Sequence, residues 1–145
     1  MSAPDAGPLY TPELLALAVT LAESPLDDDL PLRGDAVSRT CGSTLTIGLQ
    51  CDDAGRIERV GMKVSACAVG QAAAAIFAHG AQGASAQDLA AAEAAIASWL
   101  AGGDRPAWPG IEKLSAARAH PGRHGAILLP WRAARAALSN PVQAG

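Results

Sequence analysis

Two alternating segments in the first half of the chain constrain its fold most strongly. In residues 44–51, TLTIGLQC, every second side chain is apolar, and the same alternation returns in residues 59–64, RVGMKV. This two-residue period is typical of strands that bury one face. Between them stands Asp52-Asp53-Ala54-Gly55, a turn sequence. The sequence therefore predicts an antiparallel β-hairpin with one apolar face.

Helix signals lie on both sides of this hairpin. Thr11-Pro12-Glu13 supplies an N-cap, a first-turn proline and a first-turn acid. Ser85, with Asp88 three residues later, forms a capping box. Residues 27–34, DDDLPLRG, are polar and interrupted by proline, which predicts a loop that covers one side of the domain. The predicted helices run from Thr11 to Ser24, Cys67 to His79, Ser85 to Leu100, Ile111 to Ala117 and Ala126 to Leu138.

These segments predict an α+β fold, in which helices pack on one face of a small antiparallel sheet of about three strands. The 145 residues fit one domain, with residues 1–10 and 139–145 as loose tails. Half of the residues are hydrophobic but only 3% are aromatic, so we expect close packing of helices around alanine.

Composition also bears on partners and compartment. The net charge of −3 offers no basic surface for nucleic acid. No apolar run approaches the roughly 20 residues that span a bilayer, and the acidic, proline-containing N-terminus does not resemble a signal peptide. We therefore expect a cytoplasmic protein without a membrane partner. Three cysteines, an odd number, argue against a disulfide framework and leave metal binding or thiol chemistry open.

The hairpin brings two of the three cysteines together. If Cys51 pairs with Arg56, then Cys41 pairs with Ala66 and Thr40 with Cys67, so that Cys41 and Cys67 meet at the open end of the hairpin. At this separation they can share a metal ion. Cys67 also opens a helix, where the free N–H groups favour a thiolate. Cys51, on the apolar face, is expected to be a core residue.

The same residues resemble a known family. Thr40-Cys41-Gly42-Ser43, the hairpin, and Cys67-Ala68-Val69-Gly70 at a helix start are similar to the IscU/SufU/NifU-type iron–sulfur cluster scaffolds. Residues 121–133, PGRHGAILLPWRA, resemble the family's C-terminal segment, with its Pro-x-Arg and Leu-x-Trp-x-Ala spacings. The resemblance covers about residues 11–138 and implies the IscU/SufU-like fold.

The resemblance to these scaffolds also implies further metal ligands. Ser43 stands where the family has an Asp, and an ungapped match puts Ala126 in place of the third cysteine. With a shift of one residue, His124 takes the position of a family histidine and Gly125 that of the cysteine. The implied metal ligands are thus Cys41, Cys67, His124 and Ser43, of which Cys41 and Cys67 would hold the cluster. His120 is a neighbouring alternative to His124, although we expect His120 and His79 at the surface.

Three functions remain open. The first is a non-enzymatic scaffold that accepts sulfur from a cysteine desulfurase, binds iron, a [2Fe–2S] cluster or zinc, and passes the cluster to acceptor proteins. The second is a degenerate scaffold that acts as a binding or regulatory module for the desulfurase without a cluster. The third is a small thiol enzyme with Cys67 as nucleophile and His124 as base.

Overall fold

The computed structural model describes residues 11–39 and 42–139. Helix α1 (Pro12–Thr20) continues into a 3₁₀ turn (Leu21–Glu23), and strands β1 (Leu32–Ser38), β2 (Ser43–Cys51) and β3 (Ile57–Ser65) follow. Then come α2 (Ala68–Gly80), α3 (Ala86–Leu100), two 3₁₀ helices (Ile111–Ala119 and Pro121–Arg123) and α4 (His124–Ser139). The predicted α+β fold is therefore confirmed. Ser139, which the sequence prediction put in the C-terminal tail, is the last residue of α4.

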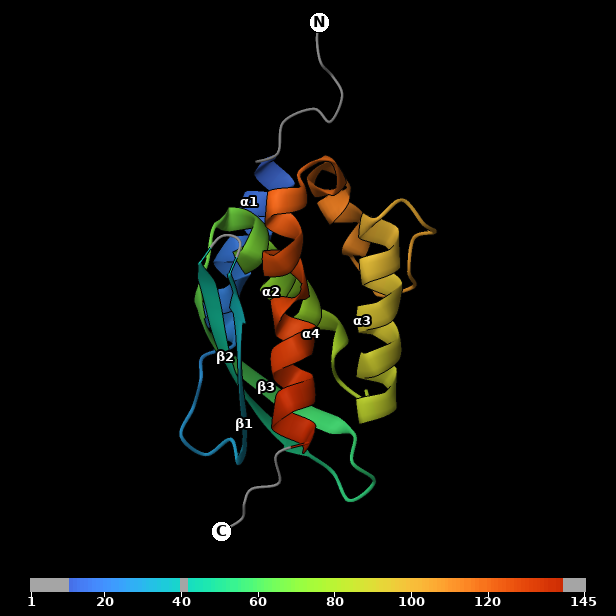
Figure 1. The fold of residues 1–145 in the computed structure, drawn as a ribbon. Helices are drawn as coiled ribbons and strands as arrows, with labels where there is room; N and C mark the ends of the chain where they lie inside the picture. The colour runs from blue at the N-terminus through green and yellow to red at the C-terminus, as the bar shows by residue number, and fades with distance from the viewer. Residues whose placement is uncertain (1–10, 40–41, 140–145) are drawn as a thin grey trace, which may run out of the picture.

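The three strands form one antiparallel sheet in the order β1-β2-β3. Its apolar face carries Leu45, Ile47 and Leu49, each at most 1% exposed, and the helices cover this face. Helix α4 packs along β1 and β2, while α2 packs beside α4 and β3. Helix α1 lies on α2, and α3 stands on the outer side of α4 (Figure 1).

Local capping explains the helix starts. The Thr11 hydroxyl accepts a hydrogen bond from the Leu14 backbone N–H at 3.1 Å. The Ser85 hydroxyl accepts one from the Asp88 N–H, and the Asp88 carboxylate accepts one from the Ser85 N–H, which completes the predicted capping box. Both helices therefore begin where the sequence signals place them.

The hairpin is formed, but its predicted register is wrong. Gln50 pairs with Arg59 and Thr44 with Ser65, and a bulge between Gln50 and Cys51 shifts the ladder so that Cys51 pairs with Ile57. The Asp52 side chain causes the longer turn, because it accepts hydrogen bonds from the backbone N–H groups of Ala54 and Arg56. Within the described residues the ladder ends at Thr44 and Ser65. The predicted pairings of Thr40 with Cys67 and of Cys41 with Ala66 involve residues 40 and 41, which lie outside the described residues.

The segment predicted as a loop over residues 27–34 is partly strand. Residues 24–31 cross the outer face of the sheet, where Leu26 and Leu30 lie over Gly48 and Gly61. From Leu32 onward the chain pairs with β2. The loop prediction is thus wrong for Leu32 to Gly34. Their sequence shows no alternation of apolar and polar side chains, because α4 packs directly on the backbone of Gly34 and leaves no room for a side chain there.

Three aromatic side chains fill the space between α2, α4 and the loop before the 3₁₀ helix Ile111–Ala119. Phe77 stacks on Trp108, and Trp131 meets both rings edge-on, with centroids 5.2–5.5 Å apart. Around them, alanines of α2 and α4 are fully buried. The predicted close packing around alanine is confirmed. In the described part of the chain, no helix is both long and apolar enough for a membrane span.

Candidate functional site

One end of the sheet gathers the segments to which the sequence assigned the site. The ladder of β1 and β2 ends at the pair Ser38 and Ser43, and that of β2 and β3 at Thr44 and Ser65. Only two residues separate the end of β3 from the start of α2. The first turn of α4 lies at the same end of the molecule (Figure 1). Chain segments far apart in sequence therefore meet here.

Cys67 is the N-cap of α2, as the sequence predicted. Its backbone is extended, and its carbonyl accepts the first helical hydrogen bond from the Gln71 N–H at 2.9 Å. The Gln71 side chain donates to the Ala66 carbonyl, also at 2.9 Å, and so fixes the residue before the cysteine. The half-buried Cys67 thiol makes no capping hydrogen bond. The first-turn N–H groups of α2 are therefore available to stabilise negative charge at this position.

Cys41 lies outside the described residues, but its neighbours on the C-terminal side are described. The Gly42 N–H donates to the Ser38 carbonyl at 2.8 Å, and Gly42 has a φ of 73°, in the left-handed region that favours glycine. Ser43, the first residue of β2, is 3% exposed, as is expected for a residue on the apolar face. The structure thus places Ser43 at the same end of the sheet as Cys67.

The first turn of α4 packs against both of these segments. A Cβ atom on Gly125 would lie 2.5 Å from the Ser38 hydroxyl oxygen, so glycine lets the helix approach the end of β1. Ala126 is fully buried, and its Cβ lies 3.3 Å from the position of a Cβ on Gly70 in α2. The two positions that match the family's third cysteine therefore lie beside the ends of β1 and α2, but neither carries a thiol.

His124, the first residue of α4, is half-buried and contacts backbone carbonyls. Its Nε2 lies 3.2 Å from the Ala117 oxygen and 3.1 Å from the Arg118 oxygen. Because carbonyl oxygens only accept hydrogen bonds, this nitrogen carries the proton. Nδ1 is then the nitrogen with the free lone pair, so a metal would bind His124 through Nδ1.

The other two histidines differ in exposure. His79 is exposed, as expected, and its Nε2 lies 3.4 Å from the Thr20 hydroxyl oxygen. His120 is half-buried, and its backbone N–H donates to the Ala117 carbonyl.

The donor set at this end of the sheet is sparse. Within residues 11–39 and 42–139, no three His, Cys, Asp or Glu side chains lie close enough together to hold a metal ion. A complete metal site therefore requires Cys41, a partner or a small-molecule ligand in addition to the described side chains.

Cys51 stands apart from this site, at the other end of β2. It lies eight positions after Ser43 along the strand, or about 27 Å at the usual rise. The half-buried thiol packs against the hydrophobic core, in line with the expected core role. Burial, and then the charges of Asp52 and Glu58, raise the pKa of this thiol.

Sequence reasoning missed two residues that shape the site, Gln71 and Ser38, and it did not foresee that Gly125 lies beside Ser38. Gln71 is the only polar residue in the run from Ala66 to Ala78, four positions after Cys67, which is a usable signal for a helix-start contact. The proximity of Ser38 and Gly125 depends on how α4 packs against the sheet, and no local pattern carries it.

Solved structures of similar fold are known. The chain is similar to the N-terminal part of a nitrogen-fixing NifU-like protein from Brucella abortus, with 27% identity, a TM-score of 0.81, and coverage of 90% of this chain and 92% of that one. A putative iron–sulfur cluster assembly scaffold protein for the SUF system from Fervidobacterium islandicum AW-1 shares the fold, with 18% identity, a TM-score of 0.79, and coverage of 90% and 96%.

A crystal structure of a hypothetical protein also shares the fold, with 20% identity, a TM-score of 0.71, and coverage of 88% and 97%. No family model matches the sequence, and no curated protein matches it as a relative. The chain thus has the fold of NifU-like and SufU-like proteins over nine-tenths of its length, and the resemblance to the IscU/SufU/NifU-type scaffolds is confirmed.

Proposed function

We propose that the protein is an iron–sulfur cluster assembly scaffold that accepts sulfur, and binds iron or a cluster as cargo, through Cys41 and Cys67. The observation that carries this proposal is the similarity to the Brucella NifU-like protein over nine-tenths of both chains. The position of Cys67 at the N-cap of α2 supports it, because the unpaired N–H groups of a helix start suit a negatively charged ligand or cluster. Ser43 and His124 are the further candidate ligands.

The sulfur-transfer step needs only an accessible thiolate. The Cys67 sulfur attacks the outer sulfur of a persulfide on a cysteine desulfurase. A new S–S bond forms, the S–S bond of the donor persulfide breaks, and the desulfurase cysteine leaves as a thiolate. Cys41 can act in the same way. An external two-electron reductant, such as a dithiol, then cleaves the S–S bond of the persulfide, which regenerates the cysteine thiolate and releases sulfide to the iron of the cargo.

Metal binding by this donor set would be open. Two thiolates and one imidazole suit iron or zinc, but they leave at least one position for water, Ser43 or a ligand from a partner. Such a site would hold a [2Fe–2S] cluster transiently and release it readily to acceptor proteins. Iron–sulfur assembly and free thiols both require a reducing compartment, and we therefore place the protein in the cytoplasm.

Metal analysis with matched variants tests this function. After anaerobic reconstitution with iron and sulfide, the wild type should show visible cluster absorbance, and Cys41→Ser and Cys67→Ser should each lose most of it. Cys51→Ser is the control and should keep it, because Cys51 lies at the other end of β2. If the wild type holds no more iron or zinc than the Cys41→Ser/Cys67→Ser double variant, the metal-scaffold function is wrong.

A second function is favoured by the sparse donor set. The described residues offer no group of three ligands, and a buried alanine takes the place of the third cysteine. A protein of this kind can bind a cysteine desulfurase and regulate it without carrying a cluster. In that case the metal-free, folded protein binds the desulfurase as tightly as the reconstituted one and changes its rate of sulfide release.

Restored ligands distinguish the two functions further. In the Ser43→Asp/Ala126→Cys variant, the family's missing carboxylate and thiol return to the ends of β2 and α4. A working scaffold should then hold its cluster longer, whereas a binding module should gain a cluster that the wild type never shows. Helical content measured by circular dichroism checks that the buried Ala126 position accepts the sulfur.

The thiol-enzyme alternative has no such support. The Nε2 atom of His124 contacts two backbone carbonyls, which leaves only Nδ1 to act as a base, and no hydrogen bond among the described residues joins His124 to Cys67. We propose a non-catalytic role.

A further inference from the structure

A groove runs between α3 and α4, away from the candidate metal site. Its volume is about 550 Å³, and it is open to solvent. Its lining on α4 begins at Arg132, eight residues after His124, or about 12 Å along the helix. The groove therefore belongs to a different surface from the end of the sheet that carries Cys67.

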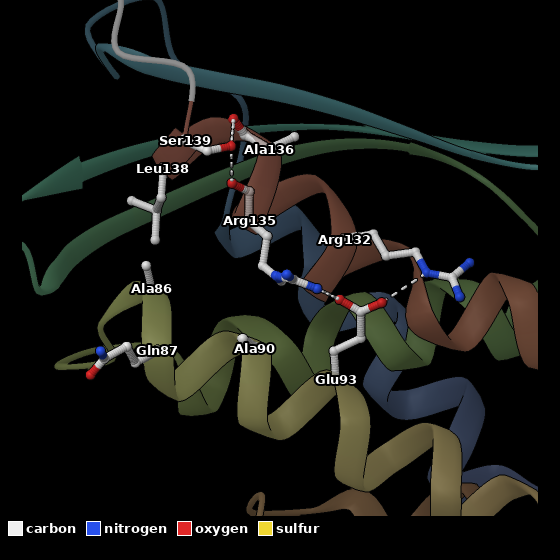
Figure 2. Close-up of a pocket in the computed structure, with 9 residues that line it drawn as sticks. All are labelled: Ala86, Gln87, Ala90, Glu93, Arg132, Arg135, Ala136, Leu138 and Ser139. Atoms are coloured by element: carbon white, nitrogen blue, oxygen red, sulfur yellow. Dashed lines mark hydrogen bonds and ion pairs between the residues drawn. The ribbon is translucent and has the colours of Figure 1, made fainter.

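The groove has a charged end built from three side chains. Glu93 of α3 accepts hydrogen bonds from both arginines, from Arg132 Nε at 3.1 Å and from Arg135 Nη1 at 2.6 Å (Figure 2). The Glu93 side chain is only 16% exposed, whereas those of Arg132 and Arg135 are 47% and 48% exposed. One carboxylate thus holds two arginines in fixed positions, and the three groups together carry one excess positive charge.

The arginines keep binding capacity beyond Glu93. A guanidinium has five N–H donors in a planar fork. Arg132 and Arg135 each use one of these donors for a hydrogen bond to Glu93. The remaining donors lie on side chains that are half exposed. A second carboxylate can therefore bind the same pair, with paired hydrogen bonds of the kind arginine makes best.

The other end of the groove is apolar. Ala86 and Ala90 of α3 face Leu138 of α4, and their small side chains leave the hollow unfilled (Figure 2). From Ala86 to Glu93 the groove extends seven residues, about 10 Å along α3. An apolar side chain fits here, two helical turns away from a carboxylate bound at the arginines.

We propose that this groove binds a short helical segment of a partner protein that carries an acidic residue and a large apolar residue seven positions apart. The carboxylate would bind Arg132 and Arg135, and the apolar side chain would fill the space between Ala86, Ala90 and Leu138. An amphipathic helix laid between two helices is a common mode of peptide recognition. The binding of this helix does not depend on the proposed metal chemistry.

A designed peptide tests the proposal on the full chain. The probe is an alanine-rich helical peptide with Leu and Glu seven positions apart, and its control is the same peptide with Gln in place of Glu. Titration into ¹⁵N-labelled protein should shift the backbone signals of residues 86–93 and 132–138. The Gln peptide should bind about tenfold more weakly, the loss expected for one desolvated charge pair.

Variants of the protein supply the matched half of the experiment. Arg132→Gln/Arg135→Gln should weaken binding of the Glu peptide about tenfold and leave that of the Gln peptide unchanged. Glu93→Gln should tighten binding of the Glu peptide, because the internal carboxylate no longer competes for the arginines. Arg105→Gln, an exposed arginine outside the groove, should change nothing.

Several results would overturn the proposal: equal binding of the two peptides, no binding of either, shifts outside the groove, or shifts that follow only the protein concentration and so report self-association. If the double arginine variant loses its circular dichroism spectrum, the peptide pair and Glu93→Gln still decide the question, because they leave both arginines in place.

Discussion

The surroundings of the Cys51 thiol predict its reactivity. Its burial, and the nearby charges of Asp52 and Glu58, disfavour the thiolate and raise the pKa. In a Cys41→Ser/Cys67→Ser background, the rate of alkylation by iodoacetamide should reach its midpoint at a higher pH in the folded protein than in urea. The sign for stability follows: the neutral thiol favours folding, and this contribution is lost as the pH rises through the folded-state pKa. Identical midpoints in the two states would contradict the effect of burial.

Single residues also show where prediction from sequence ends. Cys67 was identified as a helix start because the change from strand to helix pattern is local. The contact of Gly125 with Ser38 was not predicted, because it joins residues 87 positions apart through the packing of α4 on β1. The ligand set at the site depends on contacts of this second kind.

At the scale of elements, the capping box of α3 predicts a pH dependence. Hydrogen bonds from the Ser85 backbone and side chain, with a smaller effect of Arg56, lower the pKa of Asp88. The ionised carboxylate therefore favours the folded state above the unfolded-state pKa, and this stabilisation is lost as the pH falls through the lower folded-state pKa.

Asp88→Asn measures this contribution. Its unfolding free energy should differ most from that of the wild type near about pH 6, and the difference should shrink below about pH 3. Urea unfolding at several pH values gives both curves. A difference that stays constant with pH would mean that the charge of Asp88 plays no part in the cap.

The contact between α4 and β1 predicts a severe effect of one methyl group. A Cβ on Gly34 would collide with the backbone oxygen of Ala133 and lie 2.5 Å from the backbone nitrogen of Ala137. Because backbone atoms of a packed helix cannot move aside cheaply, Gly34→Ala should destabilise the protein by about 3 kcal/mol.

Gly122→Ala is the matched control. Nothing lies within 4 Å of a Cβ at this position, so the change in stability should stay within about 1 kcal/mol. Both values come from chemical denaturation. Equal stability of the two variants would show that α4 can shift on the sheet.

Element boundaries were predicted where the signal was a cap or a turn residue, and missed where it was a packing contact. Thr11 and Ser85 mark their helices by side-chain hydrogen bonds to the adjacent backbone. The hairpin register depended on a bulge and on the carboxylate of Asp52, which alternation alone does not reveal.

For the molecule as a whole, Phe77 is a residue at which packing from three segments meets. Its side chain in α2 is fully buried. It contacts Trp108, from the loop before the 3₁₀ helix Ile111–Ala119, and Trp131, from α4. Phe77→Ala should therefore destabilise the protein by about 3–5 kcal/mol, through lost contacts and the cavity that remains.

Val19→Ala is the control, because Val19 is 75% exposed on α1. Its effect should stay within about 0.5 kcal/mol. Near-ultraviolet circular dichroism of the tryptophans follows both transitions. A small effect of Phe77→Ala would mean that the two indole rings close the gap by themselves.

The fold class followed from sequence because period, caps and turns agreed with one another. Two features did not follow from the sequence: the order of the layers, and the meeting of four chain segments at one end of the sheet. Both arise from tertiary packing. The candidate site lies at that meeting point, which is why its cysteine could be located but its complete ligand set could not.

The segment that crosses the outer face of the sheet has a consequence for proteolysis. Gly48 and Gly61 pair across β2 and β3 and present no side chains, so that Leu30, 2% exposed, lies directly over bare backbone. The exposed Asp27-Asp28-Asp29 stretch belongs to this crossing segment. Cleavage there would free the chain ends that carry Leu26 and Leu30 and so favour exposure of the sheet face beneath them, an apolar surface prone to aggregation. A nicked chain should therefore aggregate more readily than the intact one.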